Sequence, residues 1–191
     1  MEQLSVNRWE QEVLIKRKII ISFISVIISA TGLAASGCSV EWKPSQIPET
    51  GEIAGDFQLE DLNGNSIALN DFYGKPILLN FFATWCNPCR EEIPLLETIH
   101  DDSRWQDEDL VILAVDIGEK KTTVKDFVEQ YGISFKVLVD TEREVSMQYF
   151  VRGVPTTYFI NRKGVIQNIT IGAFAGVEEI EKNLNKIISG D

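Results

Sequence analysis

The sequence contains few of the residues that several common protein functions require. Its 191 residues include only three cysteines, too few for a scaffold held by several disulfides, and one histidine, which excludes catalysis that needs two. Basic residues are also scarce: 18 stand against 29 acidic ones, a formal net charge of −11. This charge argues against nucleic-acid binding, which needs a basic surface. The remaining composition, 44% hydrophobic and 25% charged residues, is typical of a globular protein.

The first 38 residues differ in composition from the rest of the chain. They carry four basic and three acidic side chains, which leaves 14 basic and 26 acidic side chains in residues 39–191. The basic triplet at 16–18 precedes a run of 17 residues without charge, residues 19–35. This order is typical of a secretory signal or of an uncleaved membrane anchor. Both place the large domain outside the cytoplasm.

Cys38 directly follows small residues at the end of the uncharged run, an arrangement that resembles a bacterial lipobox. In a lipobox the cysteine becomes the lipidated N-terminus. Ala35 departs from the pattern, because Leu is the most frequent residue there. Lipidation of Cys38, retention of residues 19–35 as an anchor, and simple cleavage of a signal all stay open. We expect residues 1–38 to be the targeting segment, 39–52 a flexible spacer and 53–191 the exported domain.

Hydrophobic patterning over the exported part predicts an α/β domain. Asn63-Gly64, between residues 57–60 and 66–69, is a strong hairpin signal. The apolar runs at 77–82 and 111–115 are typical of strands buried on both faces. The remaining predicted elements are helices at 86–100, 124–131 and 177–188, a short strand at 135–139, a short helix at 144–150, and a second hairpin at 157–160 and 165–171. Together they predict a mixed central sheet flanked by helices, parallel at the helical crossovers and antiparallel in the hairpins.

Cys86 and Cys89 form a Cys-x-x-Cys motif where the buried strand at 77–82 meets the following helix, which indicates redox chemistry. Cys86 falls at the helix N-terminus, where unpaired backbone N–H groups and the helix dipole favour its thiolate. Cys89 can close a disulfide with Cys86 or resolve a mixed disulfide. A structural zinc site needs about four ligands. Only Cys38 and His100 remain as further cysteine or histidine ligands, so we expect no metal.

The segment 82–94, Phe-Ala-Thr-Trp-Cys-Asn-Pro-Cys-Arg-x-Glu-x-Pro, resembles the TlpA/ResA group of membrane-tethered bacterial thiol-disulfide oxidoreductases in the thioredoxin superfamily. Residues 153–157, Gly-Val-Pro-Thr-Thr, are similar to the cis-proline loop of that family. The resemblance covers about residues 53–189. It implies a thioredoxin-like fold with an N-terminal β-hairpin extension.

The resemblance also implies roles for individual residues. Pro155 would form a cis peptide bond beside the cysteines, and Val154 would offer backbone hydrogen bonds to an extended substrate. Asn80 stands where thioredoxin has a buried aspartate. Glu92, on the same helical face as Cys89, is therefore expected to supply the missing acid, although it could instead only favour the first turns of the helix. The substrate-binding residues expected from the motifs are Trp85, Asn87, Pro88, Val154 and Pro155.

Three functions are compared on this basis. The resemblance favours a thiol-disulfide oxidoreductase that reduces protein disulfides, for example those of apocytochrome c during cytochrome c maturation. It implies electrons from a membrane thiol transporter of the CcdA type, a location at the extracytoplasmic face of the bacterial envelope, a monomer, and no cofactor besides the Cys86–Cys89 disulfide. The alternative is a thiol peroxidase on the same fold, whose signature threonine stands three residues before the cysteine, whereas Thr84 stands two before Cys86. A copper chaperone of the SCO type needs a histidine near two cysteines, and His100 is poorly placed for that.

Overall fold

The structure is a computed structural model that describes residues 47–189. The expected targeting segment, Cys38 and most of the expected spacer lie outside the described residues. Within residues 47–189, none of the helices combines the length and the hydropathy needed to span a bilayer.

A mixed sheet of seven strands forms the centre of the described part, in the order β2-β1-β5-β4-β3-β6-β7. The three middle strands β5, β4 and β3 run parallel to one another, whereas β1 and β6 join them antiparallel on either side. The strands are β1 (Gln58–Asp61), β2 (Ser66–Ala68), β3 (Ile77–Phe82), β4 (Val111–Ile117), β5 (Lys136–Asp140), β6 (Thr156–Ile160) and β7 (Ile166–Ile171). The thioredoxin-like mixed sheet and its N-terminal hairpin extension are therefore confirmed.

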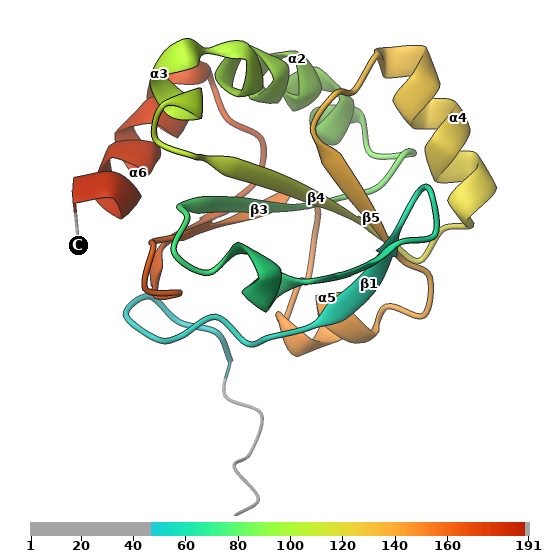
Figure 1. Ribbon diagram of the computed structural model, residues 1–191. Helices are drawn as coiled ribbons and strands as arrows, with labels where there is room; N and C mark the ends of the chain where they lie inside the picture. Colours follow the sequence, from blue (N-terminus) through green and yellow to red (C-terminus); the bar gives the residue numbers. More distant parts are fainter. Residues whose placement is uncertain (1–46, 190–191) are drawn as a thin grey trace, which may run out of the picture. The chain divides into compact units, whose positions relative to one another are not determined.

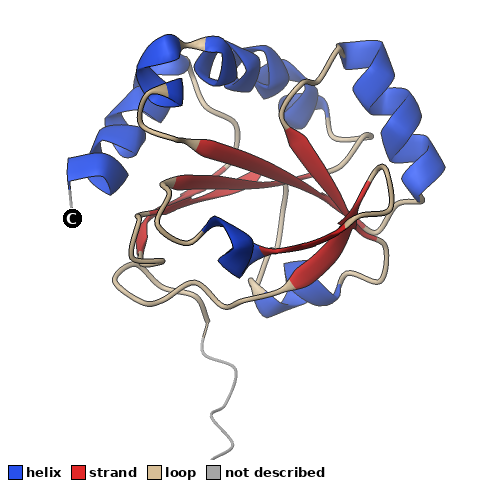
Figure 2. Cartoon of the chain, in the orientation of Figure 1, coloured by secondary structure: helices blue, strands red, loops and turns tan. Residues whose placement is uncertain are grey.

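Helices cover both faces of the sheet (Figure 2). Because β3, β4 and β5 are parallel neighbours, the two crossovers between them have the same hand and place α2 and α4 on one face, and α6 packs beside α2 there (Figure 1). The short helix α5 lies on the opposite face (Figure 1). The helices are α2 (Asn87–Asp101), α3 (Ser103–Gln106), α4 (Lys121–Tyr131), α5 (Glu144–Gln148) and α6 (Val177–Ser189), with a 3-10 turn η1 at Leu69–Phe72.

The core lies between the sheet and these helices, and its strands explain the continuous apolar runs. All six residues of β3 are buried, and so are the last six of β4. A strand with both faces covered needs no alternation of polar and apolar residues. The apolar runs were therefore correctly interpreted as central strands.

The helix α3 was not predicted, because its four residues are too few to show a helical period. It begins where the Asp102 carboxylate accepts a hydrogen bond from the Arg104 backbone N–H, and it carries Trp105 into the core. His100 is partly buried and makes an edge-on ring contact with Phe135. Neither feature changes the position of the cysteines.

Truncation of a side chain in the central strand should be costly. Leu113 in β4 is fully buried between β3 and β5. We expect Leu113→Ala to lower the free energy of unfolding by about 2–5 kcal/mol, because it removes buried methyl groups and leaves a cavity. Urea denaturation of the oxidised protein measures this. Ile171→Ala, at an 80% exposed position of β7, is the control and should change stability by less than about 0.5 kcal/mol. Equal effects of the two substitutions would contradict this assignment of the core.

Candidate active site

The two cysteines of the motif lie at the N-terminus of α2 and are joined by a disulfide. Cys86 is the N-cap residue, and its Sγ accepts a hydrogen bond from the Cys89 backbone N–H at 3.2 Å. Cys86 is 5% exposed and Cys89 only 1%. Helix N–H groups directed at Cys86 Sγ stabilise a thiolate there. A partner can therefore reach Cys86 first, while Cys89 stays behind it.

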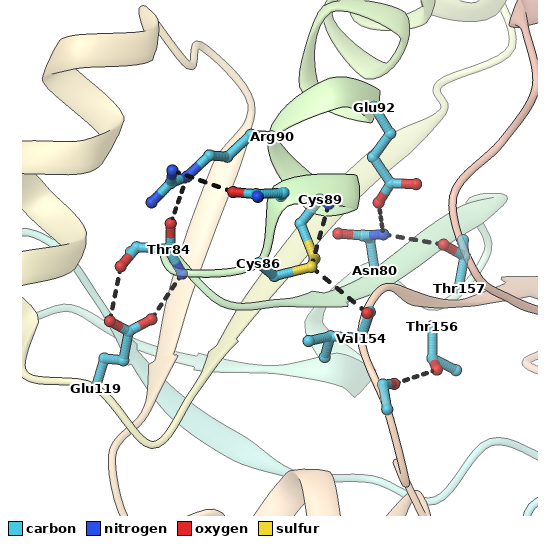
Figure 3. Close-up of a disulfide and its surroundings, with 12 residues drawn as sticks. Asn80, Thr84, Cys86, Cys89, Arg90, Glu92, Glu119, Val154, Thr156 and Thr157 are labelled. Carbon is cyan, nitrogen blue, oxygen red and sulfur yellow. Dashed lines mark hydrogen bonds between the residues drawn. A yellow bond between two sulfur atoms is a disulfide. The ribbon is translucent and has the colours of Figure 1, made fainter.

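The loop before β6 lies against the disulfide. The Val154–Pro155 peptide bond is cis, as the resemblance implied, and the Val154 carbonyl oxygen lies 3.5 Å from Cys86 Sγ (Figure 3). The antiparallel pairing of β6 with β3 places the start of β6 beside the end of β3, through the pair Phe81 and Thr156. The two motifs are 68 residues apart in sequence, and the sheet brings them together.

Four of the five residues expected to bind substrate have side chains at the surface near Cys86, whereas Pro155 is buried. Trp85 is 63% exposed, which is unusual for a side chain of its size. Asn87 and Pro88 are exposed, and Val154 is half-buried. The structure thus places these side chains where a docked partner can touch them. Their contact with substrate stays a prediction.

Glu92 lies in the interior, and the Asn80 side chain holds it in place. Glu92 is 1% exposed, and its Oε1 accepts a hydrogen bond from Asn80 Nδ2 at 2.8 Å. The same amide nitrogen donates to Thr157 Oγ1 at 2.9 Å. Figure 3 shows Asn80 between Thr157 and the disulfide, and Asn80 and Cys89 line one small cavity. Asn80, at the position where thioredoxin has an aspartate, thus connects Glu92 to the surroundings of Cys89.

Burial controls the protonation of Glu92. It raises the pKa of this carboxyl from 4.5 to about 7, against the opposing effects of the Asn80 amide and the Phe174 backbone N–H. Glu91, its neighbour on α2, is exposed. Glu92 thus exchanges a proton near neutral pH. A residue that only favoured the start of the helix would not need to be buried, so the position of Glu92 agrees better with an acid–base role.

The sequence analysis missed a second carboxylate that holds the loop before Cys86. Glu119 accepts hydrogen bonds from both the backbone N–H and the hydroxyl of Thr84, each at 2.7 Å (Figure 3). The Thr84 carbonyl accepts a third bond from Arg90 Nε at 2.7 Å. Glu119 comes two residues after the end of β4, and polar residues beyond the carboxyl ends of parallel strands are the sequence signal that marks such positions. These bonds fix the loop that carries Trp85 and Cys86.

Asp116, near the end of β4, is a further buried acid that the sequence analysis missed. It is fully buried, and its Oδ1 accepts a bond from the Glu119 backbone N–H at 3.3 Å. Burial raises its pKa to about 8, and Glu119 contributes to the rise. Among residues 47–189, no group of three or more His, Cys, Asp or Glu side chains is arranged to hold a metal ion.

A disulfide at a strand-to-helix junction, facing a cis-proline loop on this mixed sheet, defines a thiol-disulfide oxidoreductase of the thioredoxin superfamily. The model of the AhpC/TSA family matches residues 50–169. The thiol-disulfide oxidoreductase ResA of Bacillus subtilis is 37% identical over 159 residues, 82% of this chain and 87% of that protein. The chain belongs to the AhpC/TSA family and to its ResA-like thiol-disulfide oxidoreductases.

Further similar proteins agree with this assignment. The thioredoxin-like protein YneN of Bacillus subtilis is 36% identical over 140 residues, 72% of this chain and 79% of that protein. Among solved structures, a putative thiol:disulfide interchange protein DsbE from Chlorobium tepidum has a TM-score of 0.69 and 26% identity. The match covers 74% of this chain and 99% of that one. The similarity spans the described domain.

The buried carboxyl of Glu92 should make stability depend on pH. Between pH 4.5 and about 7 the folded protein keeps a proton on Glu92 that the unfolded chain loses, so stability falls as pH rises through this interval. Glu92→Gln keeps an acceptor for Asn80 and removes the titration. We expect the variant to gain up to about 3 kcal/mol relative to the native protein between pH 4 and pH 8.

Urea denaturation of the oxidised proteins at several pH values measures this difference. The matched control is Glu91→Gln, which removes the same charge from an exposed position of α2 and should leave the pH dependence unchanged. If the stability difference between Glu92→Gln and the native protein is the same from pH 4 to pH 8, folding does not raise the pKa of Glu92, and the prediction is wrong.

Proposed function

We propose that this protein is a membrane-tethered reductase of protein disulfides, with Cys86 as the attacking thiolate. The observation that carries this is the arrangement around Cys86. Its sulfur is at the helix N-terminus, next to the exposed Trp85 ring and the Val154 carbonyl, while Cys89 is buried behind it. A docked disulfide therefore meets Cys86 and not Cys89.

The reaction has two exchange steps. The Cys86 thiolate attacks one substrate sulfur, the substrate disulfide breaks, and a mixed disulfide forms with release of one substrate thiolate. The Cys89 thiolate then attacks Cys86 Sγ, and the second substrate thiolate leaves. Two electrons pass to the substrate, and the Cys86–Cys89 disulfide is the oxidised product.

Glu92 is the group that we propose to accept the proton of Cys89 before the second step. A buried thiol ionises poorly, so it needs a nearby base. Glu92 is buried one helical turn after Cys89, and its pKa of about 7 suits proton exchange at neutral pH. The hydrogen bond from Asn80 fixes the orientation of the carboxylate.

The reducing direction is supported by the two residues between the cysteines. Asn87 and Pro88 add no positive charge that would stabilise the Cys86 thiolate further. A strong oxidant such as DsbA is oxidising because its reduced form is unusually stable. A motif without such stabilisation favours a reductant.

The cellular setting is supported by the composition of residues 1–38, a basic start followed by an uncharged run and Cys38. A solved relative with 28% identity and a TM-score of 0.58 is the exposed lipoprotein thioredoxin of Streptococcus pneumoniae, which covers 69% of this chain. We propose that this domain too is held at the extracytoplasmic face of the membrane. Its substrates would include the haem-attachment cysteines of apocytochrome c, its electron donor a transporter of the CcdA type, and its working form a monomer.

The match to the AhpC/TSA family keeps thiol peroxidase as the second candidate function. In the structure the Thr84 hydroxyl donates its hydrogen bond to Glu119, so it is already engaged within the loop. A rapid loss of the Cys86 thiol that is specific for peroxide would favour the peroxidase.

A redox titration tests the direction of the reaction. We expect the Cys86–Cys89 couple to have a potential more reducing than about −200 mV, in the range of glutaredoxins and thioredoxin. We also expect the full chain in detergent micelles to catalyse the reduction of insulin, and Cys86→Ser to abolish this catalysis. A potential near that of DsbA, about −120 mV, would overturn the reductase assignment.

Trapping of the mixed disulfide tests whether the substrate is a protein. In Cys89→Ser the second step cannot occur, so Cys86 should stay bound to its substrate in the native host, and mass spectrometry would identify that substrate. The matched control is the double variant Cys86→Ser with Cys89→Ser, which should trap nothing. Absence of any trapped protein in Cys89→Ser cells would argue against a dedicated protein substrate.

A further inference from the structure

A groove of about 270 Å³ opens beside the active site, between Trp85 and the loop that leads to Val154. Its volume lies below the roughly 300–1,000 Å³ of sites for drug-sized ligands, so it suits side chains of a bound polypeptide. Two of its lining residues are arginines, Arg143 and Arg152. None of the described residues that line it is acidic.

Both arginines are exposed, and neither forms an ion pair within the described part of the chain. Arg104 on α3, by contrast, is paired with Asp102 and Glu181. The charges of Arg143 and Arg152 therefore remain available to a bound partner. Glu142 and Glu144, which flank Arg143 in sequence, line a different pocket together with Lys121. Glu119, next to the lining residue Gly118, is hydrogen-bonded to Thr84.

The neighbours of the two arginines hold their side chains at the groove. The Arg143 side chain crosses Gly118, where an added Cβ would lie only 3.1 Å from Arg143 Cδ. Gly118 also has a φ of +79°, which disfavours other residues. The Arg152 guanidinium stands 5.7 Å from the centre of the Phe150 ring, within cation–π range.

This positive groove contrasts with the rest of the exported part. Residues 39–191 carry 26 acidic against 14 basic side chains. The excess of acidic side chains disfavours an acidic partner in general, whereas the two arginines favour it at this groove next to Cys86. Guanidinium groups bind carboxylates with two parallel, charge-assisted hydrogen bonds, whereas a Gln side chain offers one uncharged acceptor oxygen and a Lys side chain offers none.

We propose that the preferred substrate is a polypeptide whose disulfide-bonded cysteine is flanked by acidic side chains, which bind Arg143 and Arg152 while the substrate sulfur meets Cys86. This rests on the proposed function, because the groove selects the substrate for the same exchange reaction. Two electrons pass from the Cys86–Cys89 dithiol to the substrate disulfide, which becomes two thiols.

Single-turnover reduction of defined peptides tests this proposal. The pre-reduced full chain in uncharged detergent is mixed with peptides whose one cysteine is capped by 2-mercaptoethanol and flanked by Glu, Gln or Lys. The neutral disulfide of 2-mercaptoethanol serves as the reference substrate. We expect the Glu peptide to react about tenfold faster than the Lys peptide at low salt, and this preference to weaken as salt screens the charges.

Substitutions test whether the two arginines cause the preference for the Glu peptide. In the double variant Arg143→Gln with Arg152→Gln, the ratio of Glu to Lys rates should fall close to one, and in Arg152→Glu it should fall below one. The matched control changes two exposed cations elsewhere, Lys163→Gln and Lys182→Gln, which removes the same net charge. It should keep the native ratio and the native rate with the reference disulfide.

The possible outcomes distinguish a failure of the proposed specificity from a failure of the proposed reductase function. If the native protein reduces the reference disulfide but shows no preference for the Glu peptide, the proposed specificity is wrong and the reductase stands. An equal loss of preference in the lysine control would also overturn it, because the effect would then come from net charge. If no disulfide is reduced at all, the proposed function itself fails.

Discussion

The position of β3 between two neighbours of opposite direction is the constraint on which the rest of the structure depends. β4 runs parallel to β3, so the segments that follow both strands emerge at the same end of the sheet. β6 runs antiparallel to β3, so the loop that precedes it reaches that same end. Cys86, Glu119 and the cis peptide at Val154–Pro155 therefore meet, although they come from three separate parts of the chain.

Two buried carboxyl groups near this meeting point have different surroundings. Glu92, on α2, has an amide partner in Asn80 and exchanges its proton near pH 7. Asp116, on β4, has its pKa raised further, and Glu119 next to it is tied to Thr84. The proton chemistry proposed for Cys89 thus involves a residue of α2, whereas the carboxylate that fixes the loop before Cys86 comes from the segment that follows β4.

The surface around the cysteines presents two kinds of group: uncharged groups next to Cys86 and two arginines in the adjoining groove. Trp85 presents an exposed apolar ring, and the Val154 carbonyl lies beside Cys86 as a backbone acceptor; we propose that both contact the backbone or side chains of an extended substrate. The charges at Arg143 and Arg152 come from the two ends of the segment that contains α5. The proposed selection of substrate thus lies in a segment that contributes neither cysteine nor Glu92.

The sequence by itself determined the central strands, the main helices and the redox pair, because buried strands, helical spacing and Cys-x-x-Cys are local patterns. Glu92 was indicated by the resemblance, together with its place on the same helical face as Cys89. Only the tertiary structure decided that Asn80 holds Glu92, that Glu119 holds Thr84 and that two arginines flank one groove. Asn80 and Glu92 are 12 residues apart in sequence, and Thr84 and Glu119 are 35 apart. Strand pairing brings such residues together, and no local sequence pattern specifies which strands pair.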